Sequence, residues 1–269
     1  MPELPEVEVT RRSIAPHVVG RRITGVTVRE RRLRWPVPAA LARARGRTLR
    51  AVHRRGKYLL LDCGRGHIIV HLGMSGSLRL VAPGTVPGAH EHVDIAFGDR
   101  LLRLRDPRRF GAVLWTEGPP QAHPRLAQLG LEPLSRAFSG RRLYALVRGR
   151  RTSIKQLLMD GRRIAGVGNI YACEALFVAG IRPMRRAGTL SLARCEALAR
   201  ALKRTLRAAI RAGGATLRDF VAGDGAPGEF QRRAWVYGRA GLPCRRCGIP
   251  IRRRVQGARA SFYCPRCQR

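Results

Sequence analysis

The sequence predicts an α+β multidomain protein with a β-rich N-terminal part, a helical middle part and a small cysteine-rich module at the C-terminus. Between about residues 20 and 117, short β-branched runs such as ITGVTV and HIIVHLG alternate with Gly, Pro and charged turns. This pattern is typical of an antiparallel sandwich or barrel. Apolar residues at helical spacing dominate residues 135–232, and two C-x2-C pairs close the chain.

The chain begins with a predicted helix over residues 5–18. Pro5 suits the first turn of a helix, and the carboxylates of Glu6 and Glu8 lie near its positive dipole end. With the β-rich runs that follow, this helix is predicted to form a first domain over residues 1–117. The Pro-rich segment 118–134 is predicted to be a linker.

Residues 135–232 are predicted to form the helical domain, and residues 233–269 the C-terminal finger. Ser153 and Gln156 have the spacing of a capping box at the start of a short helix. Cys195 falls on the apolar stripe of a longer helix and is therefore expected to be a core thiol. The pair Gly213 and Gly214 is predicted to end that helix.

Charge is the strongest bulk signal. The chain has 53 Lys+Arg against 17 Asp+Glu, which gives a formal net charge of +36 and a sequence pI near 11.8. Lysine is scarce (Lys57, Lys155 and Lys203), so a coding bias toward Arg explains part of the charge. Because neutralised phosphates release condensed counterions, a protein this basic is nevertheless expected to bind nucleic acid.

No membrane association is expected. The apolar runs are too short to span a bilayer, and neither a secretory signal nor a lipidation motif is visible. We therefore expect a soluble cytoplasmic protein that associates with the nucleoid.

Four cysteines have the spacing of a tetrahedral zinc site. Cys244, Cys247, Cys264 and Cys267 form C-x2-C-x16-C-x2-C, with a gap that suits a β-hairpin. Disulfides or unpaired thiols are the alternative, which a cytoplasmic location disfavours. Because four protein sulfurs leave no open coordination position, we predict one structural Zn2+ that stabilises a basic hairpin. The segment QGAR is its expected turn, with Arg259 on or near the tip.

The opening MPELPEVE places Pro2 and Glu3 at the start of the chain. Because the initiator Met is normally removed before a residue as small as Pro, the mature protein is expected to begin with a secondary amine. A free α-amino group titrates at about 8 and a Lys side chain at about 10.4, so the terminal amine is far more often neutral and nucleophilic. Attack on a sugar C1′ would give an iminium ion that enables elimination of the 3′ phosphate. Glu3 is then a candidate proton shuttle, although a role in helix capping explains its carboxylate equally well.

Several motifs in a fixed order carry a family resemblance. MPELPEVE is followed by RRGKYLLL, HLGMSGSLR, DPRRFG, GVGNIYACEALF, GRAGLPCRRCG and RASFYCPRC. The combination covers essentially the whole chain and resembles bacterial formamidopyrimidine-DNA glycosylases. The resemblance implies a catalytic N-terminal β-sandwich and a helix-two-turn-helix DNA-binding domain with a zinc finger, in a monomer that acts on double-stranded DNA. It also implies a bifunctional base-excision-repair enzyme that removes oxidised purines, chiefly 8-oxoguanine and formamidopyrimidines, and cuts the abasic strand by β,δ-elimination.

The resemblance assigns roles to residues within these motifs. It makes Pro2 the Schiff-base nucleophile, Glu3 the acid/base and Lys57 the proton donor for β-elimination. Arg259 matches the hairpin arginine assigned to δ-elimination. Because Arg is essentially never deprotonated, a phosphate clamp is an alternative to proton donation there. The expected DNA-binding residues are Met74, His90, Arg108, Phe110, Arg150, Lys155 and Asn169.

Extrusion of a base from the duplex requires the hole to be filled. The resemblance gives this task to Met74, Arg108 and Phe110, with the guanidinium facing the orphaned cytosine. Asn169 is expected to bind phosphate at a helix N-terminus, and His90, Arg150 and Lys155 are expected to contact the DNA backbone. The segment 216–230 aligns with the loop that covers the extruded base.

Two other functions are compatible with parts of the sequence. An endonuclease VIII-like glycosylase would prefer oxidised pyrimidines, but the HLGMSGS and DPRRF motifs favour the purine enzyme. A non-enzymatic zinc-ribbon DNA-binding protein would explain the charge and the four cysteines. It gives no reason for Pro2 beside Glu3 or for the retained Lys57. Cys63 and Cys173 are expected to be structural.

Overall fold

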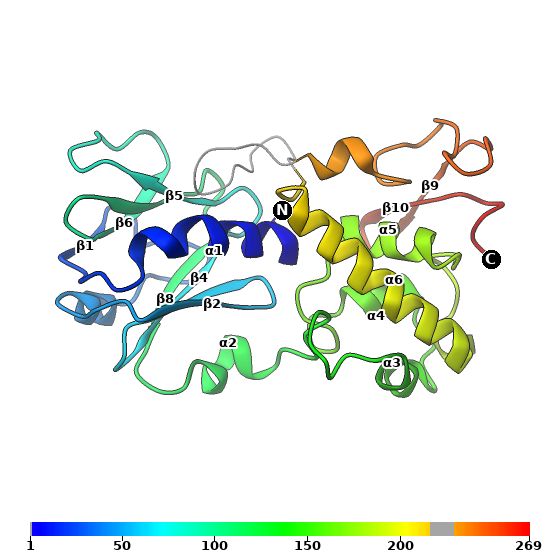
Figure 1. Ribbon diagram of the computed structural model, residues 1–269, viewed down its shortest axis with the longest axis horizontal. Coiled ribbons are helices and arrows are strands. Elements are labelled where there is room, and N and C mark those ends of the chain that lie inside the picture. Colours follow the sequence, from blue (N-terminus) through cyan, green and yellow to red (C-terminus); the bar gives the residue numbers. More distant parts are fainter. Residues whose placement is uncertain (1, 216–228) are drawn as a thin grey trace. The chain divides into compact units, whose positions relative to one another are not determined.

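The structure is a computed structural model that describes residues 2–215 and 229–269. The chain divides into two compact units, Met1–Gln128 with Ala212–Glu229, and Leu129–Arg211 with Phe230–Arg269. The first unit holds two β-sheets and a leading helix, and the second holds helices and a β-hairpin (Figure 1). The predicted α+β class is therefore confirmed.

The first unit is a sandwich of two antiparallel four-stranded sheets, with strand orders β1-β6-β7-β5 and β2-β3-β4-β8. The sequence was compatible with a sandwich or a barrel. Because each sheet has two edge strands and does not close on itself, the structure is a sandwich. The strands are β1 (Gly25–Val28), β2 (Ala51–Arg55), β3 (Tyr58–Asp62), β4 (His67–His71), β5 (Ser77–Val81), β6 (Glu91–Ala96), β7 (Leu101–Arg105) and β8 (Ala112–Thr116).

One hydrophobic core joins residues of both sheets with the helix α1 (Leu4–Val18). Alternate strand residues enter this core, as Leu59 and Leu61 do from β3, because a strand with one buried face has a side-chain period of two. Helix α1 starts one residue earlier than predicted, with Glu3 as its N-cap. Among the described residues of this unit, the connections also contain three short helices: η1 (Ala39–Ala44), η2 (Pro120–Ala122) and α2 (Pro124–Ala127).

The second unit is built on the long helix α6 (Leu192–Arg211), which packs against α3 (Gly140–Val147) and α5 (Asn169–Val178). Its buried stripe includes Cys195, as predicted. After α6 the chain turns at Gly213 and Gly214, with φ values of +71° and +82° that favour glycine. The remaining elements are α4 (Ile154–Met159), η3 (Ala187–Thr189), η4 (Phe230–Arg233), β9 (Arg252–Gln256) and β10 (Arg259–Tyr263).

The capping box predicted for α4 is present in part. The Ser153 hydroxyl oxygen accepts a hydrogen bond from the Gln156 N–H at 3.3 Å and donates its own proton to the Gln156 side chain at 2.8 Å. This cap satisfies one of the N–H groups that a helix start leaves without an intrahelical partner. It thereby fixes where α4, which carries Lys155, begins.

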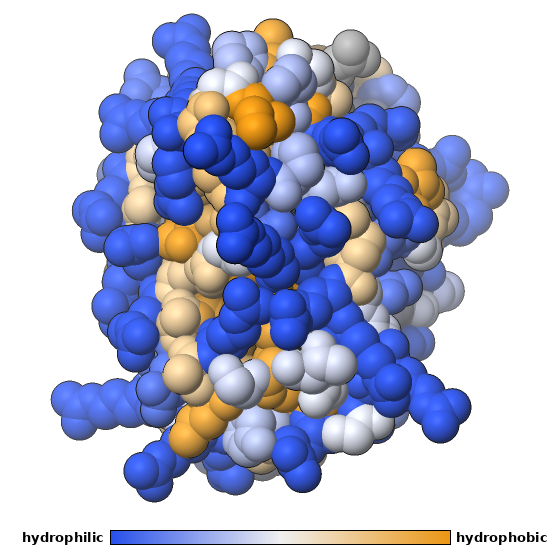
Figure 2. Space-filling view, turned by 90° about the vertical axis from the view of Figure 1, so that its right-hand side faces the viewer, coloured by the Kyte–Doolittle hydropathy of each residue, from blue (hydrophilic) through white to orange (hydrophobic). Residues whose placement is uncertain are grey.

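Hydrophilic side chains cover most of the face in Figure 2, and apolar ones lie scattered between them. This surface agrees with the large excess of Arg over acidic residues. Among the helices that the structure describes, none has the length and apolar character needed to cross a bilayer.

Candidate functional site

The N-terminus is held inside the first unit by buried carboxylates. Pro2 is buried, and Glu3 is buried as the N-cap of α1. The Glu6 carboxylate accepts the Glu3 N–H at 2.7 Å with one oxygen and the Ala215 N–H at 2.8 Å with the other. Gly214 allows this approach, since a Cβ there would lie 3.0 Å from Glu6 Oε1. Glu6, predicted only to complement the helix dipole, therefore connects the start of the chain to residue 215 through two hydrogen bonds.

Glu8, two residues further along α1, is satisfied by arginine side chains. Its carboxylate pairs with Arg11 at 2.9 Å and Arg12 at 2.8 Å, and Arg54 approaches it at 3.3 Å. Burial acts to raise the pKa of Glu8, but the hydrogen bonds from Arg11 and Arg12 outweigh it and lower that pKa to about 2. Arg54 in turn donates to the Gly56 carbonyl at 2.9 Å. The contacts of Arg54 with Glu8 and with the Gly56 carbonyl thus connect α1 to the turn that carries Lys57.

Lys57 lies in the two-residue turn between β2 and β3, where Arg55 pairs with Tyr58. Gly56 precedes it with φ of +56°, a value that the first position of such a hairpin turn requires. The Lys57 side chain is half-buried, and α1 packs against both flanking strands. The fold therefore presents this lysine from a tight turn.

His71 is a candidate functional residue that the sequence analysis missed. Strand pairing sets it opposite Tyr58, and the two rings lie 4.7 Å apart. Burial, and then the charges of Lys57 and Arg34, lower the pKa of His71 to about 3, so the imidazole is neutral at pH 7. Its Nδ1 accepts the Gly73 N–H at 3.0 Å. What marks His71 as a candidate is its position near Lys57. That position follows from the register of β3 and β4, which the sequence does not reveal.

Met74 and Phe110 lie on two neighbouring loops of the first unit. One loop runs from β4 to β5 and the other from β7 to β8, and β4 pairs with β8 as β5 pairs with β7. Both side chains are well exposed for apolar residues, at 39% and 44%. The Arg108 guanidinium lies 4.8 Å from the centre of the Phe110 ring. The structure thus brings the three predicted hole-filling residues to adjacent loops and leaves them accessible.

His90 is exposed and has a left-handed backbone, with φ of +70°. Its carbonyl accepts the Asp106 N–H at 2.9 Å. The predicted backbone-contact residue is therefore attached through its main chain to the loop that carries Arg108, while its side chain is accessible to solvent.

In the second unit, the hairpin β9–β10 carries Arg259. Gly257 and Ala258 form its turn with φ values of +51° and +59°, and Gln256 pairs with Arg259. Positive φ at both central positions is typical of a tight two-residue hairpin turn. The predicted turn QGAR is confirmed, and Arg259 is exposed beside its tip.

Lys155 and Asn169 both hold the hairpin strand next to Arg259. The Lys155 ammonium donates to the Ala260 carbonyl at 2.9 Å and to the Ser261 hydroxyl at 2.7 Å, and the side chain is only 1% exposed. The Asn169 amide donates to the same Ala260 carbonyl at 3.0 Å. In contrast, Arg150 has an exposed side chain, and its carbonyl accepts the Gly188 N–H at 3.0 Å.

Glu174 anchors the approach to the finger and was not identified from the sequence. Its carboxylate, 0% exposed on α5, accepts the backbone N–H groups of Trp235, Val236 and Tyr237 at 2.8–2.9 Å. Burial raises the pKa of Glu174 against the opposing effect of these three donors. The sequence around Glu174 carries no sign of this role, because the partners lie 61 to 63 residues further along the chain.

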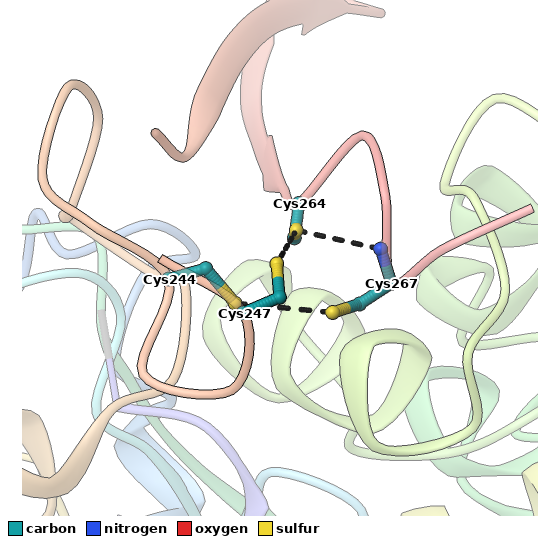
Figure 3. A group of neighbouring side chains, drawn as sticks. All are labelled: Cys244, Cys247, Cys264 and Cys267. Atoms are coloured by element: carbon teal, nitrogen blue, oxygen red, sulfur yellow. Dashed lines mark hydrogen bonds between the residues drawn. The ribbon is translucent and has the colours of Figure 1, made fainter. Parts of the chain in front are cut away.

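The four cysteine sulfurs of the finger converge from two loops (Figure 3). All four lie within 4.8 Å of one another, with Cys244 and Cys267 Sγ 4.0 Å apart and Cys247 and Cys264 Sγ 3.4 Å apart. Tetrahedral zinc with Zn–S bonds of about 2.3 Å requires sulfur separations of about 3.8 Å. The residues therefore fit the predicted ion, and the finger binds one structural Zn2+ that all four thiolates would hold.

Backbone N–H groups lie close to the sulfurs. The N–H of Ile249 lowers the pKa of Cys247 to about 7, whereas burial raises the pKa of Cys267 to about 12. The Arg246 N–H lies 3.4 Å from the Cys244 sulfur. Gln268 accepts the Cys264 N–H at 2.9 Å with its side chain and donates to the Ile181 carbonyl at 2.8 Å. The second cysteine loop is thereby tied to the helical part of the unit.

The other three cysteines are buried. Burial raises the pKa of both Cys63 and Cys195 to about 11, so neither thiol is activated at neutral pH. Cys173 packs in the same apolar cluster as Cys244 and Cys264. These environments support the structural roles predicted for them. The predicted base-covering loop 216–230 lies outside the described residues except for its last two.

Three family models match consecutive parts of the chain. They are the formamidopyrimidine-DNA glycosylase N-terminal domain over residues 1–113, the formamidopyrimidine-DNA glycosylase H2TH domain over residues 129–221, and the zinc finger found in FPG and IleRS over residues 241–269. Together with the sandwich and the four-thiolate finger, they define the class of this protein as a zinc-finger DNA glycosylase.

Individual relatives identify the family within this class. The formamidopyrimidine-DNA glycosylase of Methylococcus capsulatus (strain Bath) is 60% identical over the full length of both chains. The crystal structure of the MutM (FPG) protein from Thermus thermophilus has a TM-score of 0.89 at 42% identity and covers 99% of this chain and 98% of its own. A Lactococcus lactis FPG mutant in complex with Fapy-dG DNA has a TM-score of 0.92 at 31% identity over both full chains. This chain belongs to the formamidopyrimidine-DNA glycosylase family and is a base-excision-repair glycosylase with abasic-site lyase activity.

Loss of one finger ligand is expected to unfold the hairpin. The variant Cys244→Ser should retain less than one zinc per chain and bind duplex DNA more weakly, because structural zinc sites supply the folding energy of such modules. Metal analysis and binding titrations measure both effects, and Cys63→Ala, outside the cluster, should behave as the unmodified protein. Full zinc content with unchanged affinity in Cys244→Ser would contradict this assignment.

The buried His71 makes stability depend on pH. Because its folded pKa lies below the unfolded value of 6.5, its stabilising contribution is present above pH 6.5 and is lost as pH falls toward 3. One such group contributes a slope of up to about 1.4 kcal/mol per pH unit to the free energy of unfolding.

The variant His71→Asn isolates this contribution. The amide can still accept the Gly73 N–H but does not titrate, so urea unfolding between pH 6 and 5 should show a flatter decline than in the unmodified protein. His53→Asn, at an exposed position of β2, is the matched control and should keep the original slope. Equal slopes in all three proteins would refute the buried neutral imidazole.

Proposed function

We propose that this chain excises oxidised purines from duplex DNA through a Schiff base on Pro2 and then cuts the strand by β,δ-elimination. The observation that carries the proposal is the anchored N-terminus, where Pro2 is buried and Glu6 holds the N–H of Glu3. A reactive amine must be held in a fixed geometry to act as a nucleophile. The substrate class is supported by solved relatives named for their complexes with Fapy-dG DNA and with carbocyclic 8-oxo-G DNA.

The proposed chemistry begins at the Pro2 nitrogen. Its lone pair attacks C1′ of the damaged nucleotide, the bond from C1′ to the base breaks, and the base leaves with the electron pair and takes up a proton. Opening of the sugar ring gives an iminium ion between Pro2 and C1′. Glu3 supplies and removes the protons of these steps, including the one that the ring oxygen needs.

Strand cleavage uses the iminium ion as an electron sink. Loss of a C2′ proton breaks the bond from C3′ to the 3′ phosphate oxygen, and a second elimination releases the 5′ phosphate. Lys57 is proposed as the proton donor of the β-elimination. Its turn is supported by the chain of contacts from Glu8 through Arg54 to Gly56.

The void left by the extruded base is proposed to be filled by Met74, Arg108 and Phe110. Their exposure and their adjacent loops support this role. An apolar wedge between base steps and a guanidinium that can pair with the orphaned cytosine are what base extrusion requires. His90 is proposed to contact the DNA backbone beside them.

The second unit is proposed to bind phosphates through exposed cations. Arg150 and Arg259 have accessible side chains, and Arg259 is proposed to clamp the phosphate released in δ-elimination, since a guanidinium hardly donates a proton. Asn169 is proposed to assist at the start of α5. The buried contacts of Lys155 favour a supporting role under the hairpin over the direct DNA contact expected from the sequence.

We further propose a monomer that works on the nucleoid in the cytoplasm, because its substrate is chromosomal DNA and its charge of +36 favours that polyanion. The functional division proposed is a catalytic domain over residues 1–117, a linker over 118–134, a DNA-binding domain over 135–232 and a finger over 233–269.

Borohydride reduction during turnover on 8-oxoguanine DNA should capture the covalent intermediate. Reduction of the iminium ion gives a stable protein–DNA crosslink, which mass spectrometry should map to Pro2. Preparations that retain Met1 lack the free secondary amine and should neither crosslink nor nick the duplex. A crosslink on Lys57 or Lys155, or full activity with Met1 retained, would refute the proposed nucleophile.

Lesion preference separates the purine enzyme from an endonuclease VIII-like activity. Single-turnover excision from 8-oxoguanine:C should be faster than from thymine glycol:A in otherwise identical duplexes. A difference of about tenfold corresponds to about 1.4 kcal/mol between the two activation barriers. Faster release of thymine glycol would overturn the substrate class while leaving the glycosylase chemistry in place.

A further inference from the structure

Asp106 lies directly after β7 in the first unit and is 0% exposed. Its Oδ2 accepts the Gly111 N–H at 2.6 Å, and its Oδ1 accepts the Ser75 hydroxyl at 3.2 Å. Gly111 follows Phe110 in the chain, and Ser75 follows Met74. One buried carboxylate therefore joins the two loops that carry the proposed hole-filling side chains.

The main chain of Asp106 makes three further attachments. Its N–H donates to the His90 carbonyl at 2.9 Å, and its carbonyl accepts the Arg109 N–H at 3.2 Å. The same carbonyl lies 2.9 Å from His92 Nε2, which must carry the proton in this contact. The residue thus connects both loops to the segment that carries His90.

The two loops approach each other closely at their backbones. A Cβ on Gly73 would lie 2.4 Å from the Gly111 nitrogen and from the Phe110 carbonyl carbon, and one on Gly111 would lie 2.8 Å from the His71 carbonyl oxygen. Gly73 also has φ of +65°. Neither Gly73 nor Gly111 has room for a side chain at this junction, and the Asp106 carboxylate supplies a directional link across it.

Loss of the carboxylate would leave a buried N–H and a buried hydroxyl without their acceptor. An unsatisfied buried polar group is costly, and a hydrogen bond to an ionised acceptor is stronger than one between neutral groups. The loops would then be free to separate, and the exposed Met74 and Phe110 would lose their fixed spacing. A wedge that enters a base stack works best with such spacing, because unstacking already costs free energy and a preorganised shape avoids the further cost of ordering the loops.

We propose that Asp106 is a positioning residue that holds Met74, Arg108 and Phe110 in one arrangement for base extrusion. The inference rests on the proposed function, since it gives those three side chains the task of filling the void. It adds a specific expectation, namely that Asp106 acts on extrusion and not on the covalent chemistry. A preformed abasic site has no base to unstack and should depend on Asp106 less than an intact lesion does.

The experiment compares two single-turnover rates in the full-length protein, excision from 8-oxoguanine:C and cleavage of a preformed abasic site. Asp106→Ala should lower the ratio of excision to cleavage about tenfold, the size expected for losing hydrogen bonds to a buried carboxylate. Asp106→Asn should restore most of the ratio, because its amide oxygen can accept the Gly111 N–H and its NH2 group can donate to the Ser75 oxygen. A 2-aminopurine next to the lesion should show a weaker fluorescence rise on binding to Asp106→Ala.

Two matched controls and a milder variant keep the test decisive. Asp99→Ala removes an exposed aspartate that pairs with Arg100, and Ser13→Ala removes a hydroxyl that donates to the Thr10 carbonyl; both should keep the original ratio. Ser75→Ala breaks only the contact to the Met74 loop and should lower the ratio less than Asp106→Ala does. It decides the question if Asp106→Ala does not fold.

Wild-type ratios and fluorescence in folded Asp106→Ala, or in Ser75→Ala if the former is unfolded, would overturn the positioning role. The proposed function would fail separately, through an unmodified protein that neither releases 8-oxoguanine nor forms a borohydride crosslink.

Discussion

The scarcity of negative charge is the constraint on which this structure depends. Only 17 acidic residues stand against 53 basic ones, yet several carboxylates are buried in the part of the chain that the structure describes: Glu3, Glu6, Glu8, Asp94, Asp106 and Glu174. A carboxylate is tolerated in an interior only when hydrogen bonds or cations satisfy its oxygens. Here Glu6 and Glu174 accept backbone N–H groups from segments far along the chain. Asp106 accepts the N–H of Gly111, five residues away, and the hydroxyl of the more distant Ser75. Each carboxylate thereby fixes a piece of chain that regular secondary structure does not hold.

The loops that carry candidate functional residues are stabilised differently in the two units. In the first unit, β4 and β5 belong to different sheets, as do β7 and β8, so the loops that join them cross the edge of the sandwich and gain rigidity from its core. The hairpin β9–β10 has less apolar support, since β9 is exposed along most of its length and β10 packs through Phe262 on a small apolar cluster. Zinc thiolates at its base and the contacts of Lys155 and Asn169 on Ala260 add to that apolar burial.

Local patterns were enough to predict much of this fold. The β-rich runs of residues 20–117, the cap at Ser153 and the pair Gly213–Gly214 each depend on residues close in sequence. The strands and the glycine turn are confirmed, and the capping box is confirmed in part. The spacing of the four cysteines likewise specified the zinc site, because tetrahedral geometry restricts where paired ligands can lie. Glu174 and His71 could not be found in this way, since their partners are set by helix packing and by strand register.

Lys155 shows most clearly what the sequence predicts and what only the tertiary structure decides. From the sequence it was one of few lysines in an Arg-rich chain and was expected to contact DNA, but the structure buries its ammonium under the hairpin. The sequence by itself determined the class of fold and the metal and pointed to the candidate reactive groups, because these follow from composition, spacing and motifs within short segments. Only the tertiary structure decided which charges are buried and which backbone each one holds. Those choices depend on contacts between residues far apart in the chain, for which local sequence carries no periodic or spacing signal.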